Sequence, residues 1–290
     1  MMTLQRHSQV VVYLGLAAAL VLMFAHGAVA QQGASSRSAG GSDEPARWLM
    51  INMSTHEHSR MGRKMFRVVK TLSGNPHGKI IHFTKLSPEL LAESDPEFIV
   101  LGPQSTPWCR YKGARGIALQ NFLWLLPVVA EEMNIPILGV CGGHQALAMA
   151  FGGRVGPIRG GEEDCLPYNR ARQSGVIPIT RTAPDPLFRG MENKLRIRQN
   201  HYDEVKALPP GFLLLGSQKM SPIQIMRHPT RPVYGIQGHV EYFRRNCPDG
   251  GTIIRNFLDI ARNHNRTSRE AVSRGQSSGV MLSSVESQNN

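Results

Sequence analysis

The stretch that decides the fold is Ile137-Leu138-Gly139-Val140-Cys141-Gly142-Gly143-His144-Gln145. Its first four residues are wholly apolar, which is typical of a short strand buried on both faces of a parallel sheet. A helical pattern follows over residues 143–151 and stops at Gly152-Gly153. A cysteine between such a strand and such a helix has the context of a nucleophile elbow. The stretch therefore predicts an α/β fold with a reactive thiol at the end of a central strand.

The residues around Cys141 suit this role physically. A sharp strand-to-helix turn strains the backbone of the nucleophile, and neighbours without side chains let the turn close. The start of the helix offers unpaired N–H groups and a partial positive charge, which favour a thiolate. We expect the N–H of Gly142 to face the oxyanion that forms when the thiolate attacks a carbonyl.

A second group of reactive side chains follows the predicted strand over residues 233–237, in Gly238-His239-Val240-Glu241. In an extended segment, side chains two residues apart point to the same face. His239 and Glu241 can then act together, with the imidazole moving a proton and the carboxylate fixing the tautomer of the ring. We predict a triad of Cys141, His239 and Glu241.

These motifs resemble those of the class I glutamine amidotransferases, which carry a G-x-C-x-G-H-Q elbow and a late G-x-Q-x-H-x-E segment. Here they read 139–145 and Gly235-Ile236-Gln237-Gly238-His239-Val240-Glu241. The resemblance covers about residues 48–262. It implies an open, mostly parallel, flavodoxin-like sheet flanked by helices, and a thiol that attacks the side-chain amide of glutamine or a γ-glutamyl bond. It implies neither a cofactor nor a metal ion.

The resemblance also implies roles for residues outside the triad. Gln145 takes the place of the elbow glutamine that contacts the substrate. The motif Gln199-Asn200-His201-Tyr202-Asp203 resembles a loop that holds the α-amino and α-carboxylate groups of glutamine, so Asn200, His201 and Tyr202 are candidate binding residues. Gly102, in a loop with less glycine than the family usually has there, is the candidate for the second oxyanion N–H. Gly238 stands where the family often has an aromatic residue.

The remaining pattern predicts the layout of the sheet. Short strands are expected over residues 48–52, 79–83 and 97–101, with helical segments over 61–72 and 117–133. Further strands over 175–180, 195–198, 212–216, 222–226 and 233–237 are separated by turns, and a last helix runs over about 252–263. We expect an antiparallel section attached to the parallel sheet.

The N-terminus has the pattern of a signal peptide. An apolar run from Val10 to Ala25 follows Arg6, and Ala28-Val29-Ala30 offers a cleavage site before Gln31. We predict a signal peptide over 1–30, a flexible linker over 31–46, one domain over 47–264 and a disordered tail over 265–290. The protein is then exported, periplasmic or secreted, and keeps no stable membrane span, although retention of the segment as an anchor stays open.

Export bears on the four cysteines, Cys109, Cys141, Cys165 and Cys247. If Cys141 is free for chemistry, at most one disulfide forms among the other three, and the sequence does not choose the pair. The formal net charge of +12 is spread along the chain without a basic stripe, so we do not expect nucleic-acid binding.

The sequence alone leaves three functions open. The first is a glutamine amidotransferase whose ammonia passes to a separate synthetase subunit, because the sequence shows no ATP-binding loop. The second is a free-standing exported γ-glutamyl hydrolase, since export separates the protein from such a subunit. The third is an inactive binding domain. An α/β-hydrolase of the dienelactone type also uses G-x-C-x-G, but its acid precedes its histidine, unlike Glu241.

Overall fold

The computed structural model describes residues 47–57, 62–160, 165 and 171–286, with side chains described as far as residue 274. The predicted signal peptide, 1–30, and the predicted linker, 31–46, lie outside the described residues. Within the described part, no helix is both long enough and apolar enough to cross a membrane.

The order of elements follows the alternation expected from the sequence. The strands are β1 Trp48–Asn52, β2 Gly78–His82, β3 Phe98–Leu101, β4 Ile137–Val140, β5 Arg154–Pro157, β6 Gln173–Arg181, β7 Lys194–His201, β8 Asp203–Ala207, β9 Leu213–Ser217, β10 Ile225–Arg227 and β11 Val233–Ile236. The helices are α2 Arg63–Ser73, α3 Pro88–Ser94, α4 Gly113–Pro127, α5 Gly142–Ala150 and α6 Asp249–Glu286, with short turns η2 Phe83–Lys85, η3 Trp108–Arg110, η4 Val128–Glu132 and η5 Pro186–Phe188. The strands β5 and β8 and the helix α3 were not expected from the sequence.

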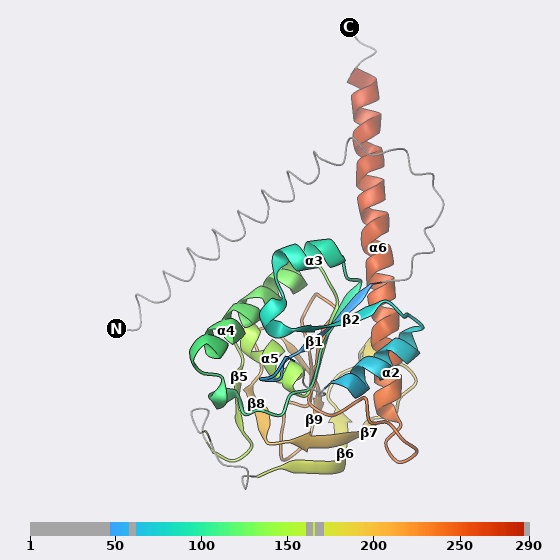
Figure 1. Ribbon diagram of the computed structural model, residues 1–290. Helices are drawn as coiled ribbons and strands as arrows, with labels where there is room; N and C mark the ends of the chain where they lie inside the picture. Colours follow the sequence, from blue (N-terminus) through green and yellow to red (C-terminus); the bar gives the residue numbers. More distant parts are fainter. Residues whose placement is uncertain (1–46, 58–61, 161–164, 166–170, 287–290) are drawn as a thin grey trace. The chain divides into compact units, whose positions relative to one another are not determined.

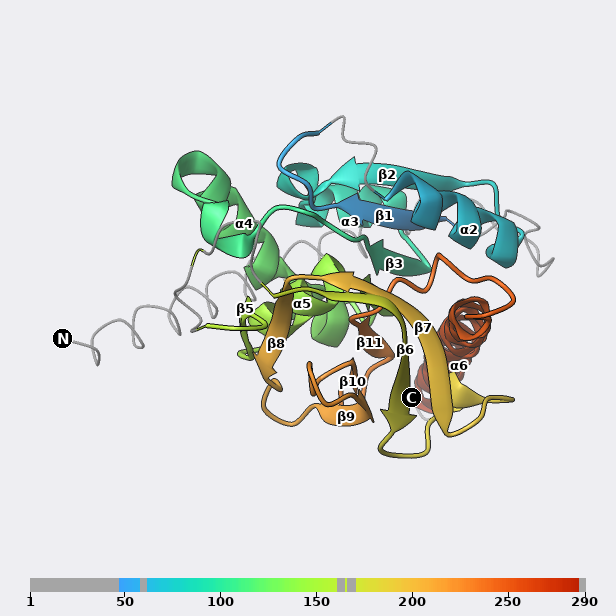
Figure 2. The ribbon, with the colours of Figure 1, turned by 90° about the horizontal axis from the view of Figure 1, so that it is seen from below.

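The described strands form one mixed sheet in the order β2-β1-β3-β4-β11-β10-β9-β6-β7, and β5 pairs with β8 in a second, small sheet. The pairs from β2 to β11 are parallel. The pairs from β11 to β7 are antiparallel. Figure 2 shows β6 and β7 running side by side at the antiparallel end. The predicted combination of a parallel sheet with an antiparallel section is confirmed.

Both faces of the parallel part are covered. In β1, Trp48 and Met50 belong to one buried cluster, and Leu49 and Ile51 belong to another on the opposite face. The first cluster includes side chains of α2 and α6, and the second includes side chains of α4 and α5. Figure 1 shows these two pairs of helices on opposite sides of the strands. This burial explains why β1, β3, β4 and β11 are apolar without alternation.

The helix predicted over 117–133 changes its winding at Pro127. The regular helix α4 ends there, and η4 continues as a π-helical turn in which Met133 N–H donates to Val128 O at 2.9 Å. A proline has no N–H for the bond that an α-helix needs. The π-helical turn follows directly after this proline and ends at Glu132.

The last helix is much longer than predicted. α6 runs to Glu286, so residues 265–286 are helical rather than a disordered tail. Asn265 donates to Glu97 O at 2.9 Å, and Arg269 pairs with the Glu97 carboxylate at 3.1 Å. The composition of this segment predicted disorder because it has few large apolar residues. The sequence could not show that its polar groups contact the turn before β3.

A disulfide joins Cys109 to Cys165, with their Cα atoms 5.5 Å apart. Cys141 and Cys247 are free and buried. The sequence allowed one disulfide but did not show which two cysteines form it. The fold determines the pair, because it brings η3 next to the segment after β5.

Candidate active site

Cys141 lies at the point where β4 becomes α5. Its backbone has φ of 54° and ψ of −105°, an unusual conformation for a residue with a side chain. Its N–H donates to Ile236 O at 2.8 Å, which extends the pairing of β4 with β11 by one residue. Its carbonyl accepts the N–H of Gln145 at 3.2 Å, which closes the first helical turn. The surrounding structure therefore holds the strained residue from both sides, as a nucleophile elbow requires.

The elbow packs directly on the neighbouring strand. A Cβ on Gly143 would lie 2.2 Å from Leu101 O at the end of β3. Because that neighbour is backbone, it cannot move aside cheaply. Glycine at this position is what lets α5 begin so close to the sheet, and the closeness brings Cys141 beside the loop that follows β3.

The histidine and the carboxylate leave the sheet at the same edge. β11 is the parallel neighbour of β4, with Ile236 opposite Val140. His239 Nδ1 lies 2.7 Å from Glu241 Oε1, and their side chains are 11% and 2% exposed. The Cys141 side chain interacts with the same ring and contributes to its raised pKa. The structure thus brings the three predicted residues into one chain of contacts.

The local geometry of this pair differs from the expectation. Residues 238–242 form a turn, in which Tyr242 N–H donates to His239 O at 3.2 Å, rather than an extended segment. His239 N–H donates to Arg198 O on β7 at 2.8 Å. The pairing of His239 with Glu241 is confirmed as a contact, and it arises from the turn and its attachment to β7.

The charge state of His239 follows from these contacts. Burial by itself lowers the pKa of His239, but the negative charge of Cys141 and hydrogen bonds with Cys141 and Glu241 outweigh it, so this pKa lies well above the ordinary value. An imidazolium beside a thiolate is the arrangement that activates a cysteine for attack. The site is therefore suited to acyl transfer.

The oxyanion donors are only partly those predicted. Gly142 and Gly143 precede the first intrahelical bond of α5, so their N–H groups have no partner within the helix. Gly102 is different, because its N–H donates to Ile51 O at 3.0 Å and continues the pairing of β3 with β1. The prediction that Gly102 provides the second oxyanion N–H is therefore wrong in this structure.

Gln104, two residues after Gly102, is better placed to provide the second oxyanion N–H. Pro103 has no N–H, so Gln104 carries the next one along the chain. Its nitrogen would lie 3.0 Å from a Cβ built on Gly142, which places it beside the elbow. No sequence pattern signals this shift, because only the sheet pairing reveals which N–H groups are already used.

Residues 90–261 match the protein family described as glutamine amidotransferase class-I, which is more than half of the chain. The chain belongs to the class I glutamine amidotransferase family. A glutamine-hydrolyzing GMP synthase subunit of Thermococcus kodakarensis is 41% identical over 130 residues, which make up 45% of this chain and 62% of the relative. The chain thus spans less than two thirds of the length of the curated relatives it matches.

Solved structures agree on the fold. A glutamine amidotransferase from Thermotoga maritima superposes with a TM-score of 0.52 at 16% identity, covering 78% of this chain and 86% of that one. A second, from Methylobacillus flagellatus, gives a TM-score of 0.54 at 14% identity, covering 77% and 95%. At these identities the likeness establishes the class I amidotransferase fold and leaves the substrate open.

The elbow glutamine of the family, Gln145, is engaged by the protein itself. Its Oε1 accepts the indole N–H of Trp108 at 2.6 Å. Its Nε2 donates to Asp203 O at 2.7 Å and to Gln237 Oε1 at 3.1 Å. Both donors are used, and one lone pair on the oxygen is left. In this structure Gln145 therefore ties the elbow to β8 and η3, and a substrate could use only that lone pair.

The motif over residues 199–203 forms strands rather than a loop. Within β7, Gln199 and His201 point inward and Asn200 points to solvent, where its Oδ1 accepts from Arg172 at 2.8 Å. His201 has Nδ1 2.9 Å from Asp203 O, and burial lowers its pKa to about 4. Tyr202 lies between β7 and β8, with the Arg172 guanidinium 5.6 Å from the centre of its ring. The motif lies next to the elbow through Asp203, but its side chains do not all face one place.

Two further residues complete the surroundings of the thiol. Gln237 is fully buried and its Nε2 lies 3.9 Å from Cys141 Sγ, within the late motif in which the sequence pattern assigned it no role. Gly238 has no room for a side chain, because a Cβ would lie 2.6 Å from Ile197 and 2.7 Å from Gln199 Nε2. Residues of β7 thus occupy the space beside Gly238 in this chain.

Proposed function

We propose that the protein hydrolyses the side-chain amide of glutamine or a γ-glutamyl bond, with Cys141 as nucleophile. The observation that carries this proposal is the contact chain from the strained Cys141 through His239 to Glu241. Membership of the class I glutamine amidotransferase family supports the same chemistry.

In the proposed reaction the Cys141 thiolate attacks the γ-carbonyl carbon, and the oxygen takes up the negative charge facing the N–H groups of Gly142 and Gln104. The C–N bond then breaks. His239 gives its proton to the departing nitrogen, which leaves as ammonia or an amine, and a γ-glutamyl thioester remains.

Water completes the cycle. His239, now neutral, takes a proton from the water that attacks the thioester carbonyl. The C–S bond breaks, glutamate leaves and the thiolate is restored beside the imidazolium. Glu241 stabilises that imidazolium in both half-reactions.

The proposal is tested by measuring glutamate and ammonia release from glutamine and from several γ-glutamyl peptides. Cys141→Ala should abolish release and retain the melting temperature of the parent, because the side chain is small. A glutamine-like diazoketone should label Cys141 before Cys247, the other free thiol. Full activity in Cys141→Ala would show that the nucleophile, and with it the reaction, is wrongly assigned.

A free-standing, exported enzyme is the form we favour over one that serves a synthetase subunit. The Thermococcus kodakarensis relative named above is a subunit of GMP synthase. Two features of this chain support export instead: the signal-like pattern before Gln31 and the Cys109–Cys165 disulfide, a bond that persists mainly in oxidising compartments. Fractionation of the native host separates the two possibilities, since the disulfide-bonded protein should be found outside the cytoplasm.

A further inference from the structure

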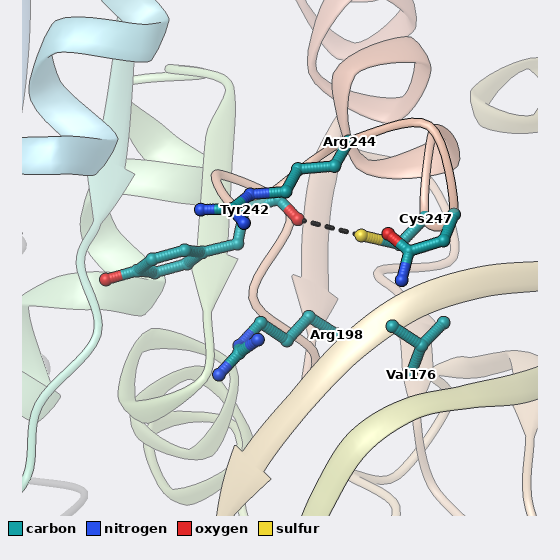
Figure 3. A pocket seen from close by; sticks show the side chains of 6 residues that line it. Val176, Arg198, Tyr242, Arg244 and Cys247 are labelled. Carbon is teal, nitrogen blue, oxygen red and sulfur yellow. Dashed lines mark hydrogen bonds between the residues drawn. The ribbon is translucent and has the colours of Figure 1, made fainter.

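A small pocket lies beside the triad, and the reaction described above does not use it. It has a volume of about 190 Å³ and is lined by Val176, Arg198, Tyr242, Arg244, Asn246 and Cys247. Val176 comes from β6, Arg198 from β7, and the others from the segment between the His239 turn and α6. Figure 3 shows the guanidinium groups of Arg198 and Arg244 on the Tyr242 side of the pocket, with Val176 and Cys247 on the other side.

The charge of this pocket is positive and not neutralised by the residues that the structure describes. None of its lining residues is a carboxylate. Among the described residues, neither Arg198 nor Arg244 forms an ion pair, whereas Arg189 and Arg227 pair with Asp259 and Asp185. The ammonium of Lys64 also lies 3.7 Å from the centre of the Tyr242 ring. Guanidinium groups bind carboxylates and phosphates through charge-assisted hydrogen bonds, so the pocket is suited to an anion.

The pocket lies on the His239 side of the nucleophile. The rings of Tyr242 and His239 meet edge to face with their centres 5.8 Å apart, and Arg198 O accepts the His239 N–H. In acyl transfer the leaving nitrogen must lie next to the histidine that protonates it. A leaving group bound beside His239 can therefore extend toward Tyr242 and the two arginines.

The dimensions limit what that part can be. Arg198 Cζ lies 5.7 Å from the Tyr242 ring centre, which with the 5.8 Å above places it at most about 11.5 Å from the His239 ring. At about 3.3–3.6 Å per extended residue, one residue spans about 3.5 Å and two span about 7 Å, and both lengths lie within this upper limit. A pocket of about 190 Å³ has the volume of about six water molecules, enough for a carboxylate end and not for a second large ligand.

We propose that Arg198 and Arg244 form a subsite for the free carboxylate of the leaving group, so that the substrates are γ-glutamyl peptides with one or two residues after the γ-glutamyl bond. This inference rests on the proposed function, since it assigns the leaving group of the same reaction. Free glutamine, whose leaving group is ammonia, makes no use of the subsite.

The experiment compares γ-glutamyl-alanylglycine with the same peptide amidated at its C-terminus, which differs only in that charge. The quantity measured is the ratio of kcat/KM for the free acid to kcat/KM for the amide. We expect a ratio of about 10 or more in the unmodified protein, the factor that one partly exposed charge-assisted contact of about 1.4 kcal/mol gives. Arg198→Gln and Arg244→Gln should each bring the ratio toward 1.

Arg245→Gln is the matched control, because Arg245 is exposed and adjacent in the chain but does not line the pocket. It should retain the ratio of the unmodified protein. Melting temperatures of all three variants confirm that each one folds.

The outcomes separate the two proposals. If glutamine and both peptides are hydrolysed with a ratio near 1, the subsite is refuted and the proposed function stands. If Arg245→Gln lowers the ratio as much as Arg198→Gln, the effect is general surface charge and the subsite is again refuted. If no compound releases glutamate, the proposed function fails and the subsite fails with it.

Discussion

Replacement of Glu241 by glutamine tests the electrostatic part of the triad with almost no change in shape. The bond from His239 Nδ1 to Glu241 Oε1 is 2.7 Å long, and the two side chains are 11% and 2% exposed. Solvent therefore screens the pair weakly. Glutamine keeps an acceptor oxygen at the same position but removes the negative charge that stabilises the imidazolium.

The magnitude follows from the change in bond type. A hydrogen bond with a charged partner contributes about 1.5–3 kcal/mol, against about 0.5–1.5 kcal/mol for a neutral one. The loss of about 1–2 kcal/mol corresponds to a fall in kcat of about 5- to 30-fold, at one factor of ten for each 1.36 kcal/mol. His239→Ala should cost more, about 10²- to 10⁴-fold, because it removes the proton carrier itself.

The pH profile gives a second readout. His239 must be protonated to supply the leaving nitrogen, so activity should fall as the pH rises through its raised pKa. Glu241→Gln removes part of the cause of that rise, and the alkaline limb should therefore move to lower pH. The same sign applies to stability: the contribution of His239 is fully present below its unfolded pKa and is lost as the pH rises through the folded pKa.

The assay is steady-state glutamate release between pH 5 and 10 for the parent, Glu241→Gln and Glu131→Gln. Glu131 provides the control because it also faces a histidine, His228, at 3.4 Å, but its side chain is 52% exposed and lies outside the triad. An unchanged kcat together with an unmoved alkaline limb in Glu241→Gln would refute the role of this carboxylate. An equal loss in Glu131→Gln would refute the reasoning from burial.

Three further predictions concern the scaffold and the N-terminus. Cys109→Ser opens the bridge to Cys165, which lies 56 residues further along the chain. In urea titrations the free energy of unfolding should fall by about 2–4 kcal/mol, because the unfolded chain regains the conformational freedom of that loop. An unchanged midpoint would show that the bridge is absent in solution. His144 and His201 are buried, and burial lowers their pKa values to about 3 and about 4, so the unfolded chain binds more protons than the folded one below pH 6.5. Each histidine should therefore remove up to about 1.4 kcal/mol of stability per pH unit as the pH falls toward 4. In melting curves His201→Gln should flatten this slope, and an equally steep slope would contradict the prediction. N-terminal sequencing of the exported protein should begin at Gln31, and an intact N-terminus in the cytoplasm would contradict export.

The sequence by itself determined the features that depend on local pattern. A buried strand, a cysteine and glycines followed by a helix specify the elbow at Cys141, because strain, backbone packing and an open helix start are all encoded within a few residues. The parallel core was equally predictable, since β1, β3, β4 and β11 carry unbroken apolar runs. His239 and Glu241 were found by their spacing, although the turn that joins them is not the extended segment that the spacing suggested.

Tertiary structure decided the features that depend on partners distant in the chain. Gly102 was a reasonable oxyanion donor until the pairing of β3 with β1 showed its N–H bonded to Ile51 O. Gln145 looked free to meet a substrate until Trp108 and Asp203 were brought to its amide. A hydrogen-bonding group has few bonds to make, and only the folded chain shows which are already made.

The same reason applies to the arginines beside the triad and to the last helix. Arg198 and Arg244 lie far apart in the sequence, so no local pattern could show that the fold brings both to one pocket. Residues 265–286 have a composition that predicts disorder, yet contacts of Asn265 and Arg269 with Glu97 extend α6 beyond its apolar part. Local sequence limits what a residue is able to do, and the long-range contacts of the fold decide which of those interactions it makes.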